Sequence, residues 1–219
     1  MVSFDLDGHG TNSNTIFNPS QVTQNIAENL DFLDKGNHLP NLILGQSLGG
    51  ALAIQYLAEN NAIDCRASIF ASVPIHIDLK KVEVFKEIAG FMRSSFISQW
   101  KHYGIYGSLP AAGNFRRDDY PIRLPPNNQQ LDYKKIIPDF INMMDINKQC
   151  SKIPIPALLL YGTYDTLSTI QHGKQLQNNL PNATLHIEKK ESHFTTLLCK
   201  NVKEQITNWI HYILIESIS

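Results

Sequence analysis

Apolar and polar residues alternate along this chain in blocks that predict strands and helices in turn. Short apolar stretches of the kind that form buried strands occur at residues 2–6, 42–44, 67–73, 156–161 and 184–188. Between them, apolar residues recur at helical spacing over 20–35, 48–59, 168–180 and 196–216. Alternating strands and helices predict an α/β protein with a mostly parallel sheet and helices on both faces.

This alternation stops between residues 75 and 153. Apolar residues from Leu79 to Phe96 have helical spacing, a polar loop follows over 108–130, and 132–147 is again helical in pattern. We interpret the region as a helical lid over the carboxyl edge of the sheet, where open α/β sheets bind ligands. A surface excursion without a substrate role is the alternative. The expected parts are a first core segment (1–74), the lid (75–153) and a second core segment (154–219).

Composition and charge argue against several classes of function. With 19 basic and 20 acidic residues among 219, the net charge is -1, which argues against nucleic acid as a partner. No apolar run has the length of a membrane span, and the first residues do not form a signal peptide. Three widely spaced cysteines fit neither a disulfide framework nor a metal site and suggest a reducing compartment, so we expect a cytoplasmic location. No metal or other cofactor is indicated by the motifs.

The most informative motif lies at the junction of a predicted strand and a predicted helix. Gly45-Gln46-Ser47-Leu48-Gly49 follows the strand at 42–44 and has the G-x-S-x-G pattern of a nucleophile elbow. Glycines at 45 and 49 are expected where strand and helix pack too closely for side chains. An ordinary glycine-rich turn with an idle serine is the alternative interpretation.

Two further residues complete a chemically meaningful set. Asp165 lies just past the strand at 156–161, and His193 follows the strand at 184–188. In a parallel sheet these strand ends share one edge with Ser47. A serine hydroxyl needs a base within hydrogen-bond reach, and a carboxylate orients that base. The order Ser, Asp, His is that of α/β-hydrolases.

These motifs resemble those of the α/β-hydrolase superfamily, in the group that contains monoacylglycerol lipases and carboxylesterases. The elbow, the acid-bearing strand end Tyr161-Gly162-Thr163-Tyr164-Asp165 and the loop Ser192-His193-Phe194 are similar to the family's motifs, and so is the turn Asp5-Leu6-Asp7-Gly8-His9-Gly10. The resemblance implies that Ser47 is the nucleophile, His193 the general base and acid, and Asp165 the orienting carboxylate. It also implies that Leu48 supplies one oxyanion-hole amide.

The chain departs from the family at its beginning. Three strands precede the D-x-x-G-x-G turn in the family, and the loop after the third supplies the second oxyanion amide. In the sequence as given, only Met1 comes before the apolar stretch at residues 2–6. We therefore expect an N-terminally truncated version of a longer hydrolase or a decayed relative.

Several other residues are candidates for the site. Gln46 and His76 are candidate substrate-binding residues, although a loop histidine without a chemical role is an alternative for His76. His9 is expected to be structural, and Asp145 is a less favoured acid than Asp165. The run Arg116-Arg117-Asp118-Asp119 could bind an anionic head or form a solvated charge cluster, and Phe91-Met92 with Met143-Met144 could line an acyl pocket or belong to the core.

The expected function is that of a serine hydrolase for a small or medium carboxylic ester or thioester. A catalytically weakened relative that binds a small molecule or a partner is the second reading. Carbon–carbon cleavage or an elimination with the same three residues is the third, because fold does not determine substrate. The sequence leaves the oligomeric state open.

Overall fold

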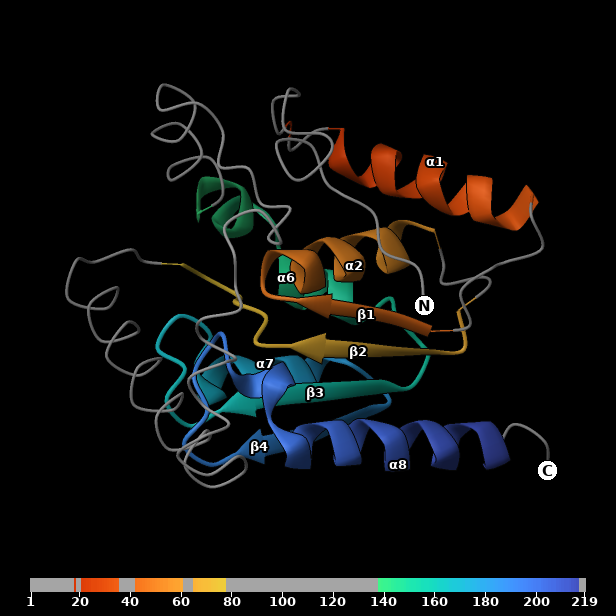
Figure 1. Ribbon diagram of the computed structural model, residues 1–219. Coiled ribbons are helices and arrows are strands. Elements are labelled where there is room, and N and C mark those ends of the chain that lie inside the picture. Colours follow the sequence, from red (N-terminus) through yellow and green to blue (C-terminus); the bar gives the residue numbers. More distant parts are fainter. Residues whose placement is uncertain (1–17, 19–20, 36–41, 61–64, 78–137, 217–219) are drawn as a thin grey trace, which may run out of the picture.

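A computed structural model of the protein describes residue 18 and residues 21–35, 42–60, 65–77 and 138–216. Four strands form its sheet in the order β1 (Leu42–Gln46), β2 (Ala67–Ala71), β3 (Ala157–Gly162) and β4 (Ala183–Glu188). Each neighbouring pair is parallel, so all four carboxyl ends lie on one edge, at the left in Figure 1. The α/β prediction with a parallel sheet is confirmed.

Alternating side chains of the strands build two apolar cores. Phe70, Leu159 and Tyr161 lie in the core formed with α2 (Leu48–Glu59), α6 (Ile146–Cys150) and α7 (Ile170–Asn179). Their neighbours Ile69, Leu158 and Leu160 face the other way, toward a core that includes Val202 of α8 (Lys200–Glu216). A period of two that is apolar on both faces is characteristic of a sheet covered by helices on both sides (Figure 1).

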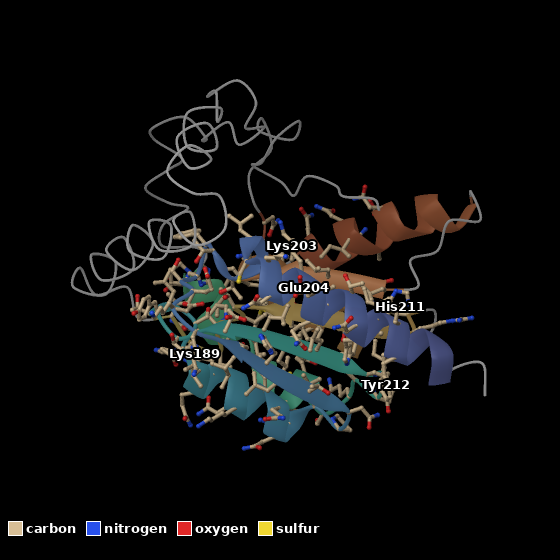
Figure 2. All side chains as sticks on the ribbon, turned by 60° about the horizontal axis from the view of Figure 1, so that its bottom comes forward. Lys189, Lys203, Glu204, His211 and Tyr212 are labelled. Atoms are coloured by element: carbon tan, nitrogen blue, oxygen red, sulfur yellow. The ribbon has the colours of Figure 1, made fainter. Side chains whose placement is uncertain are left out.

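Helix α1 (Val22–Lys35) forms an outer layer. Its buried Val22 and Ile26 pack with Leu52 of α2 and with Phe140. The polar side of α8 lies on the outside, where Lys203, Glu204, His211 and Tyr212 are exposed (Figure 2). Among the described helices, none combines the length and the apolar character needed to cross a membrane.

Several element ends differ from the sequence prediction. Strand β2 ends at Ala71, because Ser72 has a φ of 50°, which leaves the extended conformation. The final predicted helix is divided into a 3-10 turn, η2 (Thr196–Leu198), and α8, with Cys199 extended between them. The helical pattern predicted for 132–147 is helical at 138–143 and is interrupted at Asp145, which accepts a 3.1 Å hydrogen bond from the Lys148 N–H and begins α6.

Residues 78–137, the larger part of the predicted lid, lie outside the described residues, and so do the predicted strand at 2–6 and the run 116–119. The two described segments that flank residues 78–137 are joined directly. The side chain of Asn142 accepts from the Ile77 N–H at 2.8 Å and donates to the Ile77 carbonyl at 2.9 Å. The chain therefore leaves and rejoins the described core at one place, and the lid itself stays a prediction.

Candidate active site

Ser47 occupies a strained turn between β1 and α2. Its backbone angles are φ 53° and ψ -121°, a conformation that non-glycine residues rarely adopt. Its N–H donates to the Ala71 carbonyl of the neighbouring strand at 2.9 Å, and its carbonyl accepts the N–H groups of Gly50 and Ala51 in α2. The turn is thus attached to both flanking elements, as the strand–turn–helix pattern predicted.

Close packing at this turn depends on two glycines, and only one of them is the expected one. A Cβ on Gly45 would lie 2.6 Å from the carbonyl oxygen of Gly49, and one on Gly50 would lie 2.3 Å from a methyl of Val73. At Gly49 a Cβ would meet no atom within 4 Å. The expectation that Gly49 is sterically required is wrong, because the helix presents Gly50, not Gly49, to the sheet.

Side chains from three strand ends form a continuous chain of hydrogen bonds. Nε2 of His193 lies 2.8 Å from Oγ of Ser47, and its Nδ1 lies 3.1 and 3.2 Å from the two carboxylate oxygens of Asp165. The side chain of Asp165 is fully buried and that of His193 is 5% exposed. The three residues singled out in the sequence therefore lie together at the carboxyl edge of the sheet.

The carboxylate of Asp165 is held on its other side by backbone groups. Its Oδ1 accepts the N–H of Ser168 at 2.6 Å and that of Leu167 at 3.1 Å. The buried Tyr161 of β3 donates a hydrogen bond from its hydroxyl to the Val73 carbonyl at 2.7 Å. Burial and the nearby charge of Asp165 raise the pKa of Tyr161 well above its usual range, so the phenol stays protonated.

The loop that carries His193 is itself a compact turn. The Ser192 N–H donates to Oγ1 of Thr195, and Oγ1 of Thr196 donates to the Ser192 carbonyl at 2.8 Å. Glu191, which precedes this turn, is attached to the loop that carries Asp165, because its carbonyl accepts the Tyr164 N–H at 2.8 Å. Gly162 permits this approach, since a Cβ there would lie 2.1 Å from the Glu191 carbonyl oxygen. The acid and histidine loops are thereby held in fixed relation.

Glu191 is a buried carboxyl two residues before His193. Burial raises its pKa, although hydrogen bonds with Thr195 and Cys199 act in the opposite direction, and the charge of Glu188 adds to the rise. The unfolded chain therefore loses this proton first as pH increases from about 4.5, the ordinary value for the group. Between that pH and the higher folded pKa, the free energy of unfolding falls, and above it the loss is complete.

We predict that Glu191→Gln stabilises the protein relative to wild type at pH 8 and does so less at pH 4.5. The variant cannot ionise at this site, so it escapes the loss that wild type suffers as pH rises. Thermal melts at both pH values measure the effect, since about 1 kcal/mol shifts Tm by about 2–4 °C in a chain of this size. Glu204→Gln, at an exposed site on α8, is the control. An equal difference at both pH values would contradict the prediction.

The remaining candidates occupy different positions. Leu48 begins α2, where N–H groups lack acceptors within the helix, as an oxyanion donor requires. The side chain of Gln46 donates to the backbone carbonyl of His193 at 2.9 Å. His76 is exposed beyond β2. Asp145 caps α6.

Sequence reasoning missed the residues that hold the site together. Glu191, Thr195 and Thr196 carried no motif signal beyond their nearness to His193. His172 was also missed, and its pKa is lowered mainly by burial. Its Nδ1 is buried and has no hydrogen-bond partner among the described residues. Among all the residues that the structure describes, no group of three potential metal ligands is suitably placed for a metal ion.

One known sequence family matches most of the chain. The sequence model of the family described as "Serine aminopeptidase, S33" (Hydrolase_4) matches residues 1–196. Among curated proteins, no sequence matches this chain.

Solved structures with a similar fold include three bacterial proteins. A lipase-esterase related protein from Clostridium acetobutylicum has 19% identity and a TM-score of 0.64, covering 93% of this chain and 81% of that one. MenH from S. aureus has 21% identity and a TM-score of 0.61, with coverages of 99% and 83%. A bromoperoxidase from Bacillus anthracis has 18% identity and a TM-score of 0.62, with coverages of 96% and 79%. At these identities the likeness is one of fold.

Proposed function

Because the chain belongs to the serine aminopeptidase S33 family of the α/β-hydrolase superfamily, we propose that it is a serine hydrolase that works through an acyl-enzyme. Its substrate is a small or medium carboxylic ester or thioester. The observation that carries the proposal is the chain of hydrogen bonds from Ser47 through His193 to Asp165, at 2.8 and 3.1 Å. Each residue in it has the chemical character that its position requires.

In the first half-reaction, Oγ of Ser47 attacks the carbonyl carbon of the ester while Nε2 of His193 takes the hydroxyl proton. The buried carboxylate of Asp165 stabilises the imidazolium and keeps the remaining proton on Nδ1. Negative charge develops on the substrate oxygen, and the Leu48 N–H at the start of α2 is the donor proposed to stabilise it.

Collapse of the tetrahedral intermediate breaks the bond to the leaving alcohol or thiol. His193 returns its proton to that group, which leaves an ester between Ser47 and the acyl part. Water then attacks this acyl-enzyme with His193 again as base, and collapse releases the acid and restores the serine hydroxyl. His193 returns every proton that it takes during the cycle, and no cofactor takes part in these steps.

An alkyl fluorophosphonate tests the proposal, because it phosphonylates only a serine that a neighbouring base activates. We predict that native protein is modified at Ser47, as located by mass spectrometry of its peptides, and that His193→Ala is not. Ser151→Ala, which removes an exposed hydroxyl, should react like wild type. Absence of labelling in folded wild type would overturn the proposal.

The class of acyl bond can be examined with paired substrates. An aminoacyl p-nitroanilide represents the bond implied by the family description, and p-nitrophenyl butyrate represents a simple ester. The ester is the substrate that we propose, so its kcat/KM should be the larger. A larger kcat/KM for the anilide would leave Ser47 as the proposed nucleophile, but it would show that the preferred substrate is an amide and not an ester.

The cysteines support a reducing compartment as the proposed location, which we take to be the cytoplasm. Cys65, Cys150 and Cys199 are all buried, and Cys150 and Cys199 are free thiols. Burial raises the pKa of the Cys150 thiol to about 12, so this group remains protonated and unreactive.

A further inference from the structure

The residue before the proposed nucleophile makes a contact that the sequence did not suggest. Gln46 is the last residue of β1, and its side-chain amide donates to the backbone carbonyl oxygen of His193 at 2.9 Å. The two residues are 147 positions apart in the chain. This hydrogen bond therefore joins the strand of the nucleophile directly to the backbone of the proposed base.

A second link runs between the same two segments. Ser47 and His193 are joined through their side chains at 2.8 Å, and Gln46 joins the preceding position to the same residue's backbone. The backbone bond constrains where the imidazole is attached, and the side-chain bond constrains where its tip lies. Two adjacent residues of the elbow thus hold one histidine at two points.

The turn around His193 makes the contribution of Gln46 distinct. Hydrogen bonds within the turn from the N–H groups of Thr195 and Thr196 and from Oγ1 of Thr196 all end on the Ser192 carbonyl. They set the internal shape of the turn. The bond from Gln46 instead sets the position of the turn relative to β1, and so relative to Ser47.

We propose that Gln46 is a positioning residue that holds the imidazole of His193 at proton-transfer distance from Ser47. This inference rests on the proposed function, since it assigns Gln46 a part in that reaction. Proton transfer requires a donor–acceptor distance of about 2.6–3.2 Å, and a displacement of about 1 Å can lower a rate by about 10². Small movements of the histidine turn are therefore sufficient to affect catalysis.

The sequence suggested that Gln46 contacts the substrate. That role and the positioning role predict different effects of replacing Gln46. A residue that binds the substrate contributes to KM, and its effect depends on the acyl or alcohol group. A residue that orients the base contributes to kcat equally for every ester, and it also affects reaction with a fluorophosphonate. The Nε2 group of Gln46 already donates to the protein's own backbone, which favours the second role.

Gln46→Leu and Gln46→Glu test the inference. The first removes the donor, and the second places a carboxylate oxygen against the carbonyl of His193. We predict that both lower kcat by roughly 10–100-fold with KM within about a factor of two, by the same factor for p-nitrophenyl acetate and butyrate. The rate of fluorophosphonate labelling at Ser47 should fall by that factor too. Gln177→Leu and Gln177→Glu, at an exposed site on α7, are the matched controls.

The outcomes separate this inference from the proposed function. Labelling of wild type with unchanged rates in folded Gln46 variants would overturn the positioning role and leave the hydrolase intact. A raised KM, or a loss that differs between acetate and butyrate, would assign Gln46 to the substrate and also overturn it. Wild type that does not label at all would instead overturn the proposed function. If Gln46→Leu does not fold, Gln46→Met, which keeps an unbranched chain of similar length, is read by the same criteria.

Discussion

Replacing Ser47 by alanine or by glycine is expected to abolish ester hydrolysis, with kcat lower by about 10⁶ in both variants. The loss follows because both variants lack the hydroxyl whose Oγ lies 2.8 Å from Nε2 of His193 and attacks the substrate. Assays with p-nitrophenyl butyrate measure it. Residual activity near the wild-type value would show that another group attacks the substrate.

The same pair of variants should differ in stability, because the backbone at this position is strained. With φ at 53° and ψ at -121°, a side chain at position 47 costs about 1–3 kcal/mol, a cost that alanine keeps and glycine avoids. Glycine loses about 0.4–1 kcal/mol of this advantage through the greater freedom of the unfolded chain. We therefore expect Ser47→Gly to melt at a higher temperature than Ser47→Ala.

A second strained serine supplies the control. Ser72 has a φ of 50° at the end of β2, and its hydroxyl is fully buried. Ser72→Gly should likewise melt above Ser72→Ala. Glycine could raise the melting temperature relative to alanine at position 72 but not at position 47. In that case the turn at Ser47 is not strained in solution, and the surrounding fold does not impose its backbone angles.

The fold could be predicted largely from local patterns. Buried strands such as β3 are short and continuously apolar, and α2 is rich in helix-forming residues after the two glycines of its first turn. Strand and helix order then implied a parallel sheet. Because parallel strands end on one edge, the same argument brought Ser47, Asp165 and His193 to one place before any distance was known.

What escaped prediction depends on contacts between distant segments. The pattern at 196–216 is helical throughout, yet Cys199 is extended there because the preceding residues are committed to the His193 turn through Thr195 and Thr196. The bond from Gln46 to the His193 carbonyl leaves no periodic signal either, since its partners are 147 residues apart. Asp145 shows a local exception, because capping residues carry a known preference and the start of α6 could have been inferred from it.

Asp165→Asn is expected to lower kcat by about 10⁴ while the fold is kept. The reason lies in the backbone groups that hold the carboxylate. Oδ1 accepts the N–H groups of Ser168 and Leu167, so the asparagine must place its carbonyl oxygen there. Its amide nitrogen then takes the place of Oδ2, 3.1 Å from Nδ1 of His193.

That exchange reverses the tautomer of the histidine. An amide N–H facing Nδ1 requires an unprotonated Nδ1, which moves the ring proton to Nε2, where it blocks transfer of the proton from Ser47. Rates of butyrate hydrolysis and of fluorophosphonate labelling measure the loss, and circular dichroism verifies the fold. Asp145→Asn is the matched control, because an asparagine oxygen still accepts the Lys148 N–H and caps α6. If Asp145→Asn lost activity while Asp165→Asn retained it, the orienting acid would be Asp145, and the burial of Asp165 beside His193 would be only structural.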